Sequence, residues 1–508
     1  MELEKRKERE NIFLDNKLAP YIEDLNEQKL SLRRKTISKI LKIKRMNKLE
    51  QMKSSLDIIN KALQFEINKF SSCFNIIISY LQSSDNNILY YTLNQLCTYF
   101  KYNEPDIKEQ KMIIEGQFLE ILLNLGINFL KQKNIENLIL IIWIFINIQF
   151  YKEGNGEYIE NLYNEKFFDF YNECFCSSYS EEITNEIILL LHHITQISND
   201  LNIKVLNSKV FNSIIFFILN EELDLEFSES IIKLIIACLN ISQNYEPNEL
   251  EINLIDKCLI ILKTESEKDN EKIQKLCYKG LYNISKLNDK YEFNIKMIQH
   301  KIPLSIMKIK NKDVKKLLYE LKTLTNILAV SDDYLGKINL KELILYYNEI
   351  LNLYDDDDKI VNIILNGIIN IADSKYAYVI ESSVVWNEEK IQKYFSKNEN
   401  IQLLFIKIVK YIINIGNYYS LNFIYKTKVL EYLIYLISNS NTNVKIIRKI
   451  LKIVDNYLDR FKSNEKANLE YIIIYNKFIN WMNLFIDEIN EENDVFEYIK
   501  EKYKYSEM

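Results

Sequence analysis

The stretch that decides the fold is IIWIFINI, residues 141–148, together with the phrases that repeat it further along the chain. Each phrase is a short apolar run that ends in Asn-Ile, and the later ones are LIIACLNI from Leu234, YKGLYNIS from Tyr278, LKTLTNIL from Leu321, NGIINIAD from Asn366 and YIINIGNY from Tyr411. We call the recurring polar position the asparagine ladder. Its members are Asn147, His193, Asn240, Asn283, Asn326, Asn370 and Asn414.

The spacing of the ladder indicates an internal repeat. Its last four steps are 43, 43, 44 and 44 residues, and the first gap of 93 residues divides into two units at His193, in LLLHHITQ. A second phrase recurs between the ladder positions, as in IIEGQFLEILL from Ile113 and YKTKVLEYLIYLI from Tyr425. This period is typical of armadillo and HEAT repeats.

Each unit is predicted to contain a short helix, an amphipathic second helix and a longer third helix that ends near the ladder residue. No such helix buries its apolar face alone, so neighbouring units must stack into a continuous core. We therefore predict an all-α, armadillo-repeat superhelical solenoid of roughly nine repeats. The predicted segments are a basic N-terminal arm at 1–55, the repeats at 56–460 and capping helices with an acidic tail at 461–508.

Composition excludes several other classes. The 508 residues include 8 Gly and 4 Pro, which leaves little material for tight turns and hairpins. The longest apolar stretch, Leu138 to Ile148, has about half of the roughly 20 residues that a bilayer requires. Because the N-terminus MELEKRKERE resembles no signal or transit peptide, we expect the protein in the cytoplasm and nucleus.

The sequence predicts neither an enzyme nor a cofactor or metal site. Its three histidines are His192, His193 and His300, and the phosphate-binding, zinc-protease and nucleophile-elbow motifs do not occur. The seven cysteines are scattered and are expected to be reduced core residues. The run Asp355 to Asp358 is expected to be a solvated loop and helix N-cap rather than a metal site.

The ladder suggests a way to bind peptides. A carboxamide has one acceptor and two donors, so an Asn on an inner face can bind both the N–H and the C=O of an extended peptide. Trp143 lies one helical turn before Asn147, where its ring could flank a ligand Lys or Arg, although a core position explains it equally well. Three of the six equivalent positions are Lys279, Lys322 and Lys410, which would repel a basic ligand.

A basic segment precedes the repeats. Residues 29–48 contain nine cations and no acid, whereas the whole chain has a net charge of −6. The apolar residues between these cations suit an amphipathic helix that binds an acidic groove, in this chain or in a partner protein. A nucleic-acid or membrane-surface tail is the alternative for this segment.

Together these features resemble the importin alpha family. The run LRRKTISKILKIKRMN from Leu32 resembles the family's importin-beta-binding segment, IIEGQFLEILL resembles its VIEAG-type phrase, and WIFINI resembles its WALTNI. The chain departs from the family because most tryptophans beside the ladder are absent and His193 replaces an asparagine.

The resemblance implies a nuclear import adaptor that carries nuclear-localisation-signal cargo. It assigns cargo binding to Trp143 and the asparagine ladder, with a minor site around Asn326, Asn370 and Asn414. It assigns importin beta binding to the arm residues Arg33, Arg34, Lys35, Lys42, Lys44 and Arg45. It also implies an export receptor at the C-terminal end, and it implies neither a membrane nor a nucleic acid as partner.

Two other functions remain open at this point. The missing tryptophans favour an armadillo scaffold of another kind, cytoskeletal or ciliary, which binds extended or helical peptides without a role in import. A solenoid that binds RNA through the basic arm is the third hypothesis.

Overall fold

The computed structural model describes residues 67 and 69–462, apart from 104, 149–162, 178–180, 222–224, 242–244, 288–291, 309–312, 416–417 and 438–443, and it also describes residue 476. Every regular element in this part of the chain is a helix, which confirms the predicted all-α class. The predicted N-terminal arm lies outside the described residues. So does the predicted capping segment, apart from residues 461, 462 and 476.

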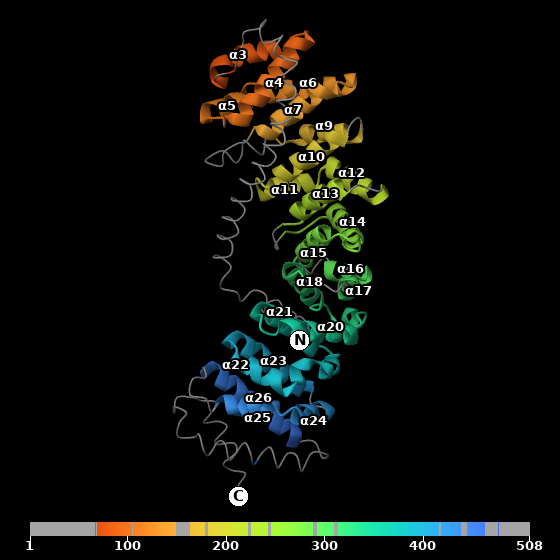
Figure 1. Cartoon of the computed structure of the whole chain (residues 1–508), viewed down its shortest axis with the longest axis vertical. Coiled ribbons are helices and arrows are strands. Elements are labelled where there is room, and N and C mark those ends of the chain that lie inside the picture. The colour runs from red at the N-terminus through yellow and green to blue at the C-terminus, as the bar shows by residue number, and fades with distance from the viewer. Residues whose placement is uncertain are drawn as a thin grey trace. The chain divides into compact units, whose positions relative to one another are not determined.

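The chain divides into two compact units, one up to residue 291 and the other from residue 292. The helices of the first unit follow one another as stacked groups (Figure 1). They are α3 (Phe70–Leu81), α4 (Asn86–Tyr102), α5 (Ile107–Glu115), α6 (Phe118–Gln132), α7 (Ile135–Asn147), α9 (Glu165–Cys176), α10 (Glu181–Ile194), α11 (Asn199–Leu206), α12 (Lys209–Asn220), α13 (Leu225–Cys238), α14 (Glu249–Ser266) and α15 (Glu271–Ser285).

The second unit continues the same pattern, with two short 3-10 helices in place of one α-helix. Its elements are α16 (Phe293–Gln299), α17 (Ile302–Lys308), α18 (Val314–Ile327), α19 (Asp332–Leu335), α20 (Leu340–Tyr354), α21 (Asp358–Ala372), η2 (Ala377–Ser382), η3 (Val384–Trp386), α22 (Glu388–Ser396), α23 (Glu399–Ile415), α24 (Tyr418–Lys426), α25 (Val429–Ile437) and α26 (Val444–Lys462).

The third helix of each repeat packs against the third helix of the next repeat. In the first unit the contacts run from α4 to α7, α10, α13 and α15, and in the second unit they run from α18 to α21, α23 and α26. Each unit is therefore a helical stack in which the apolar faces of neighbouring repeats form one core. The described residues contain nine such third helices, as predicted, and each unit is an α-solenoid.

Asn and Asp side chains fix where many of the helices begin. Asp106 and Asn248 form capping boxes, in which their side chains accept from the backbone N–H groups of Glu109 and Glu251 at 2.8 and 3.0 Å. The glutamates in turn accept from the N-cap N–H groups. Such caps satisfy donors that have no partner within the helix.

The turn before the second helix has a repeated backbone shape. Gln117, Lys301 and Lys428 lie directly before α6, α17 and α25, and their φ angles are 56°, 60° and 55°. The left-handed region is unfavourable for residues with a side chain. These three residues occupy the same position in their repeats, whereas Ser208 before α12 has φ −74°, so three repeats share a left-handed turn without a glycine.

A glycine lets two helices approach closely in one repeat of each unit. Gly280 in α15 and Gly367 in α21 both lie three residues before a ladder asparagine. A Cβ atom at Gly367 would lie 2.6 Å from the Tyr347 hydroxyl of α20, and one at Gly280 would lie 2.7 Å from Leu262 of α14. A side chain at either position would force Leu262 or Tyr347 to move in a close-packed core.

The apolar helices are core elements. Every residue of α7 from Asn137 to Ile146 is buried. Among the described residues, no single helix has the length and apolar character to cross a bilayer. Two bent pairs, Ile107–Ile113 with Phe118–Gln132 and Asn199–Leu206 with Lys209–Asn220, meet that criterion only as pairs.

The cysteines follow the prediction in part. Cys97, Cys174, Cys238, Cys258 and Cys277 are buried. Cys73 is only half-buried and Cys176, at the C-terminal end of α9, is exposed, so the prediction that all seven belong to the core is wrong for these two.

The four aspartates between α20 and α21 cap a helix and bind lysines. The side chain of Asp357 is the N-cap of α21 and accepts from the backbone N–H groups of Lys359 and Ile360 at 2.9 and 3.2 Å, which confirms the predicted cap. Asp355 and Asp356 both pair with Lys393 of α22, at 2.9 and 2.7 Å. The run thus joins consecutive repeats of the second unit.

Replacing the capping residue should loosen the first turn of α21. We expect Asp357→Ala to lower the local opening free energy by about 1 kcal/mol, because two backbone donors lose their acceptor. Amide hydrogen exchange should therefore be about fivefold faster in that turn. Asp356→Ala is the matched control, since this side chain is 90% exposed and only pairs at the surface. Equal exchange in the two variants would contradict the assignment.

Candidate functional site

The asparagine ladder lies at the C-terminal ends of consecutive third helices. Asn147, His193, Asn283, Asn326, Asn370 and Asn414 fall within the last turn of their helices, and Asn240 follows α13 by two residues. The predicted register of the ladder on the third helices is confirmed.

Two of the ladder side chains donate hydrogen bonds to the end of the preceding third helix. We call such a contact between two third helices a joint. Asn283 is 6% exposed, and its Nδ2 donates to the carbonyl of Ile236 in α13 at 3.4 Å. Asn370 is 8% exposed, and its Nδ2 donates to the carbonyl of Thr325 in α18 at 3.0 Å. Both acceptors are among the last four carbonyls of the preceding third helix, which have no partner within their own helix. The structure thus places these amides inside the stack, contrary to the predicted contact with a bound peptide.

The last ladder position joins its neighbour by a different set of bonds. Asn414 of α23 is exposed, and its Oδ1 accepts from Nδ2 of Asn456 in α26 at 2.8 Å. Arg460 donates from Nη1 to the Asn414 carbonyl at 2.8 Å and from Nε to the Asn456 Oδ1 at 3.0 Å. The same end of the third helix is used here as well to join two repeats.

The ladder continues beyond the predicted positions at both ends. Asn456 lies 42 residues after Asn414, and Asn103, the C-cap of α4, lies 44 residues before Asn147. Neither is followed by isoleucine, so the Asn-Ile phrase did not reveal them. Spacing alone, without the dipeptide, would have found both.

The remaining ladder residues differ in their exposure. Asn326 is buried with 6% of its surface exposed, Asn147 and His193 are half-buried, and Asn240 is exposed. Peptide contacts by Asn147, His193 and Asn240 therefore stay a prediction.

Trp143 belongs to the core of the first unit. Its side chain is 1% exposed within α7, and its Nε1 has no hydrogen-bond acceptor among the described residues. An enclosed ring cannot flank the side chain of a bound peptide. The predicted role of Trp143 in a cargo site is wrong in this structure, and its core alternative holds.

At three repeats the residue one turn before the ladder is more accessible than the buried ladder residue Asn283, Asn326 or Asn370. Lys279, Lys322 and Asn366 are half-buried, and Lys410 is exposed. Asn366 Nδ2 donates to Asn362 Oδ1 at 2.9 Å, so the two half-buried carboxamides form a hydrogen-bonded pair on the accessible side of α21. Among the second unit's third helices, this pair is a better candidate than Asn370 for contacts with a peptide backbone.

Basic side chains dominate the accessible surface of the third helices in the second unit. We define the third-helix face as the accessible side chains of α18, α21, α23 and α26. Its cations are Lys315, Lys322, Lys359, Lys407, Lys410, Arg448, Lys449, Lys452 and Arg460, and its acids are Asp358, Glu399, Asp455 and Asp459. The surface of this face is therefore net positive.

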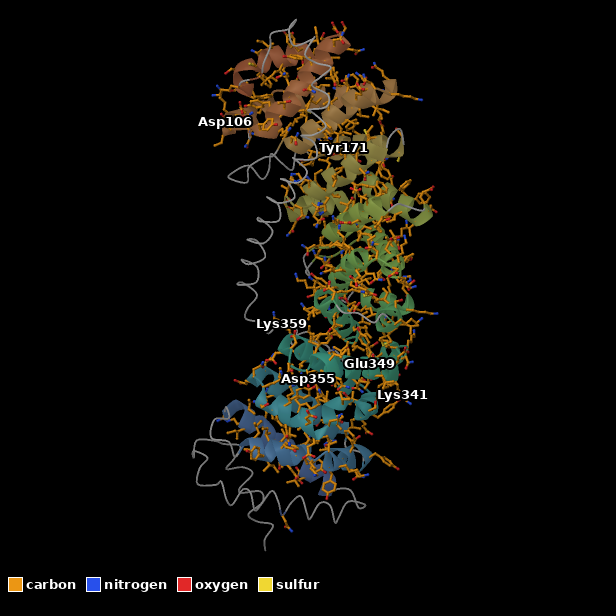
Figure 2. The ribbon with its side chains drawn as sticks, in the orientation of Figure 1. Asp106, Tyr171, Lys341, Glu349, Asp355 and Lys359 are labelled. Atoms are coloured by element: carbon orange, nitrogen blue, oxygen red, sulfur yellow. The ribbon has the colours of Figure 1, made fainter. Side chains whose placement is uncertain are left out.

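One acid of this face is already neutralised, because Asp358 binds Lys397. Figure 2 labels Lys359 on one side of the second unit and Lys341 and Glu349 of α20 on the other. Lys359 of the third-helix face thus lies on another side of the unit than these two residues of α20 (Figure 2).

Positive charge also gathers on the third helices of the first unit. Burial lowers the pKa of His192 in α10 to about 4, and the charges of His193, Lys233 and Lys279 act in the same direction. Lys233 and Lys279 belong to α13 and α15, so three successive third helices place basic groups near one another. Glu229 offsets part of this charge, because it pairs with Lys233 and Lys272 at 2.5 and 2.7 Å.

A cleft of about 620 Å³ lies elsewhere in the first unit, between α6 and α9. Its apolar lining residues are Leu119, Leu123, Ile127, Phe167 and Phe170, and its charged lining residues are Glu115, Glu120, Lys166, Asp169 and Glu173. The described residues contain no group of three or more His, Cys, Asp or Glu side chains arranged to hold a metal ion. The cleft is acidic, opposite in charge to the third-helix face.

Solved structures share this fold. An engineered protein of known crystal structure covers 83% of this chain and 96% of its own, with 13% identity and a TM-score of 0.54. A chain from a structure on the phosphorylation switch between cadherin and β-catenin covers 76% of this chain and 71% of its own, with 10% identity and a TM-score of 0.53. The chain has an armadillo-type solenoid fold. At these identities the likeness concerns the fold alone.

Sequence comparison adds nothing to this result. No family model and no curated protein sequence matches the chain. The predicted importin-beta-binding residues of the arm lie outside the described residues.

Removing one joint amide should loosen the second unit. We expect Asn370→Ala to lower the opening free energy of α18 and α21 by about 1 to 2 kcal/mol, because the Thr325 carbonyl loses its donor in a buried joint. Amide hydrogen exchange of the last turn of α18 and of α21 measures this change. Asn366→Ala is the matched control, because its amide bonds only within α21. A larger effect in the control would show that the joint does not stabilise the stack.

Proposed function

We propose that this chain is an armadillo-repeat scaffold that binds extended segments of other proteins along its third helices. The observation that carries the proposal is the ordered stacking of third helices in each unit, which brings equivalent accessible positions side by side. Packed helices lie about 8 to 10 Å apart. An extended peptide advances about 3.3 to 3.6 Å per residue. Successive helices thus meet such a ligand at every second or third residue.

The chemistry of these positions supports binding rather than catalysis. The accessible groups on the third helices are mainly amines and carboxamides, such as Lys322, Asn362 and Asn366. Carboxamides bind both donor and acceptor groups of a peptide main chain, whatever its side chains. Cations at these positions favour acidic ligands over basic ones.

Selection of binding peptides tests the scaffold proposal. We expect a displayed library of unstructured segments to yield binders of the full chain. A benzophenone at the centre of such a peptide should cross-link to the third helices, for instance α18, α21 or α23, and mass spectrometry would locate the adducts. Failure to select any binder, or cross-links confined to second helices such as α20, would contradict the proposal.

A nuclear import adaptor is the second candidate, and the basic arm favours it. Residues 29–48 contain nine cations and no acid, in a run that resembles an importin-beta-binding segment. The accessible cations of the third helices do not favour basic nuclear localisation signals as cargo, since like charges repel. An adaptor of this kind would work in both cytoplasm and nucleus.

A pull-down separates the two candidates. If the chain is an import adaptor, immobilised importin beta should retain the full chain. It should not retain a full-length variant in which Arg33, Arg34, Lys35, Lys44 and Arg45 are changed to Glu. Binding should also weaken with added salt, because the contacts are between charged groups. Retention of the charge-reversed variant, or no retention of the wild type, would exclude the adaptor function and leave the scaffold proposal intact.

A further inference from the structure

Cations outnumber acids on the third-helix face of the second unit. Among the described side chains of α18, α21, α23 and α26, nine accessible cations stand against four acids, and one of these acids, Asp358, binds Lys397. The second helix α20 is different, because its accessible charged residues are one lysine, Lys341, and two glutamates, Glu342 and Glu349. The excess of positive charge on the third helices is thus not shared by α20.

The positive charges of two of these lysines act on each other across neighbouring helices. Lys322 on α18 has a pKa below its usual value, first because it is partly buried and second because the positive charge of Lys359 on α21 acts on it. A nearby carboxylate would favour the charged form of the Lys322 amine. A ligand anion would therefore relieve a repulsion that the free protein sustains.

The neighbouring side chains suit a peptide main chain. The carboxamide pair of Asn362 and Asn366 lies on α21, between the helices that carry Lys322 and Lys410. It presents both an acceptor and donors, which match the alternating N–H and C=O groups of an extended peptide. A nucleic-acid backbone has no N–H groups to match them, so the pair favours a peptide over RNA.

The dimensions of the face set the length of the ligand. The four third helices pack in sequence order, so Lys322 and Lys452 are separated by three helix-to-helix steps, or roughly 24 to 30 Å. An extended chain covers this distance with about seven to nine residues. Carboxylates at every second or third residue would then reach one helix after another.

We propose that this face binds an extended acidic peptide, with Lys322, Lys359, Lys410 and Lys452 contacting its carboxylates and Asn362 and Asn366 contacting its main chain. The inference rests on the proposed scaffold function and adds the chemical class of the ligand to it.

Fluorescence anisotropy with the full chain tests the inference. The probes are three fluorescein-labelled peptides of about twelve residues that alternate Ser with Glu, Lys or Gln. We expect the Glu peptide to bind most tightly and to weaken as NaCl rises from about 50 to 500 mM, because salt screens exposed charges.

Charge reversal locates the site. The double variant Lys359→Glu with Lys410→Glu should bind the Glu peptide at least about fivefold more weakly. Lys341→Glu on α20 is the matched control and should stay within about twofold of the wild type. All three lysines are exposed, so the substitutions should leave the fold intact, and circular dichroism checks this.

The remaining outcomes distinguish the two proposals. Equal binding of the Gln or Lys peptide would overturn the acidic ligand and leave the scaffold function standing, whereas binding of none of the peptides by the wild type would overturn the acidic ligand and count against the scaffold as well. Equal losses in the double variant and the control would also overturn the inference. Displacement of the Glu peptide by polyuridylate at a lower concentration than unlabelled Glu peptide would make the face an RNA site instead.

Discussion

A third helix of this chain removes its apolar side chains from water by packing against the second helix of its own repeat and against the third helices of neighbouring repeats. This constraint explains the recurring phrase, in which an apolar run is followed by a polar residue near the helix end. It also explains the joints. Where two stacked helices end, the last carbonyls lack partners, and Asn283 and Asn370 supply the donors. At these two positions the joint accounts for the asparagine, whether or not a ligand is bound.

The fold was largely predictable from the sequence because the buried positions of the stacked helices recur at a regular spacing along the chain. The ladder spacing and the apolar runs identified the third helices, and the Asp355 to Asp358 run identified the start of α21 at Asp357. Asn103 and Asn456 were missed because the dipeptide Asn-Ile was used as the marker. Asn456 takes part in a contact between repeats although no isoleucine follows it, so the dipeptide is too narrow a marker for this feature.

The site was less predictable, because a period gives the position along a helix but not the direction of each side chain. Residues four apart, such as Asn366 and Asn370, differ by about 40° around a helix of 3.6 residues per turn. Because of that difference, Asn370 is 8% exposed and bonds to the preceding third helix, whereas Asn366 is half-buried on the accessible side of α21. The same ambiguity applies to Trp143, whose ring turns into the core at 1% exposure. Sequence alone does not resolve a rotation of this size.

The two kinds of position on a third helix are under different physical constraints. A buried position such as Ile364 or Asn370 must fit its neighbours, since protein interiors are close-packed. An accessible position such as Lys359 or Lys410 contributes little to stability, so its charge can change without loss of the fold. This explains how the chain shares its fold with solved structures at 10 and 13% identity while those identities say nothing about its ligand. The ligand must therefore be inferred from the accessible side chains themselves, and in the second unit these are predominantly cations.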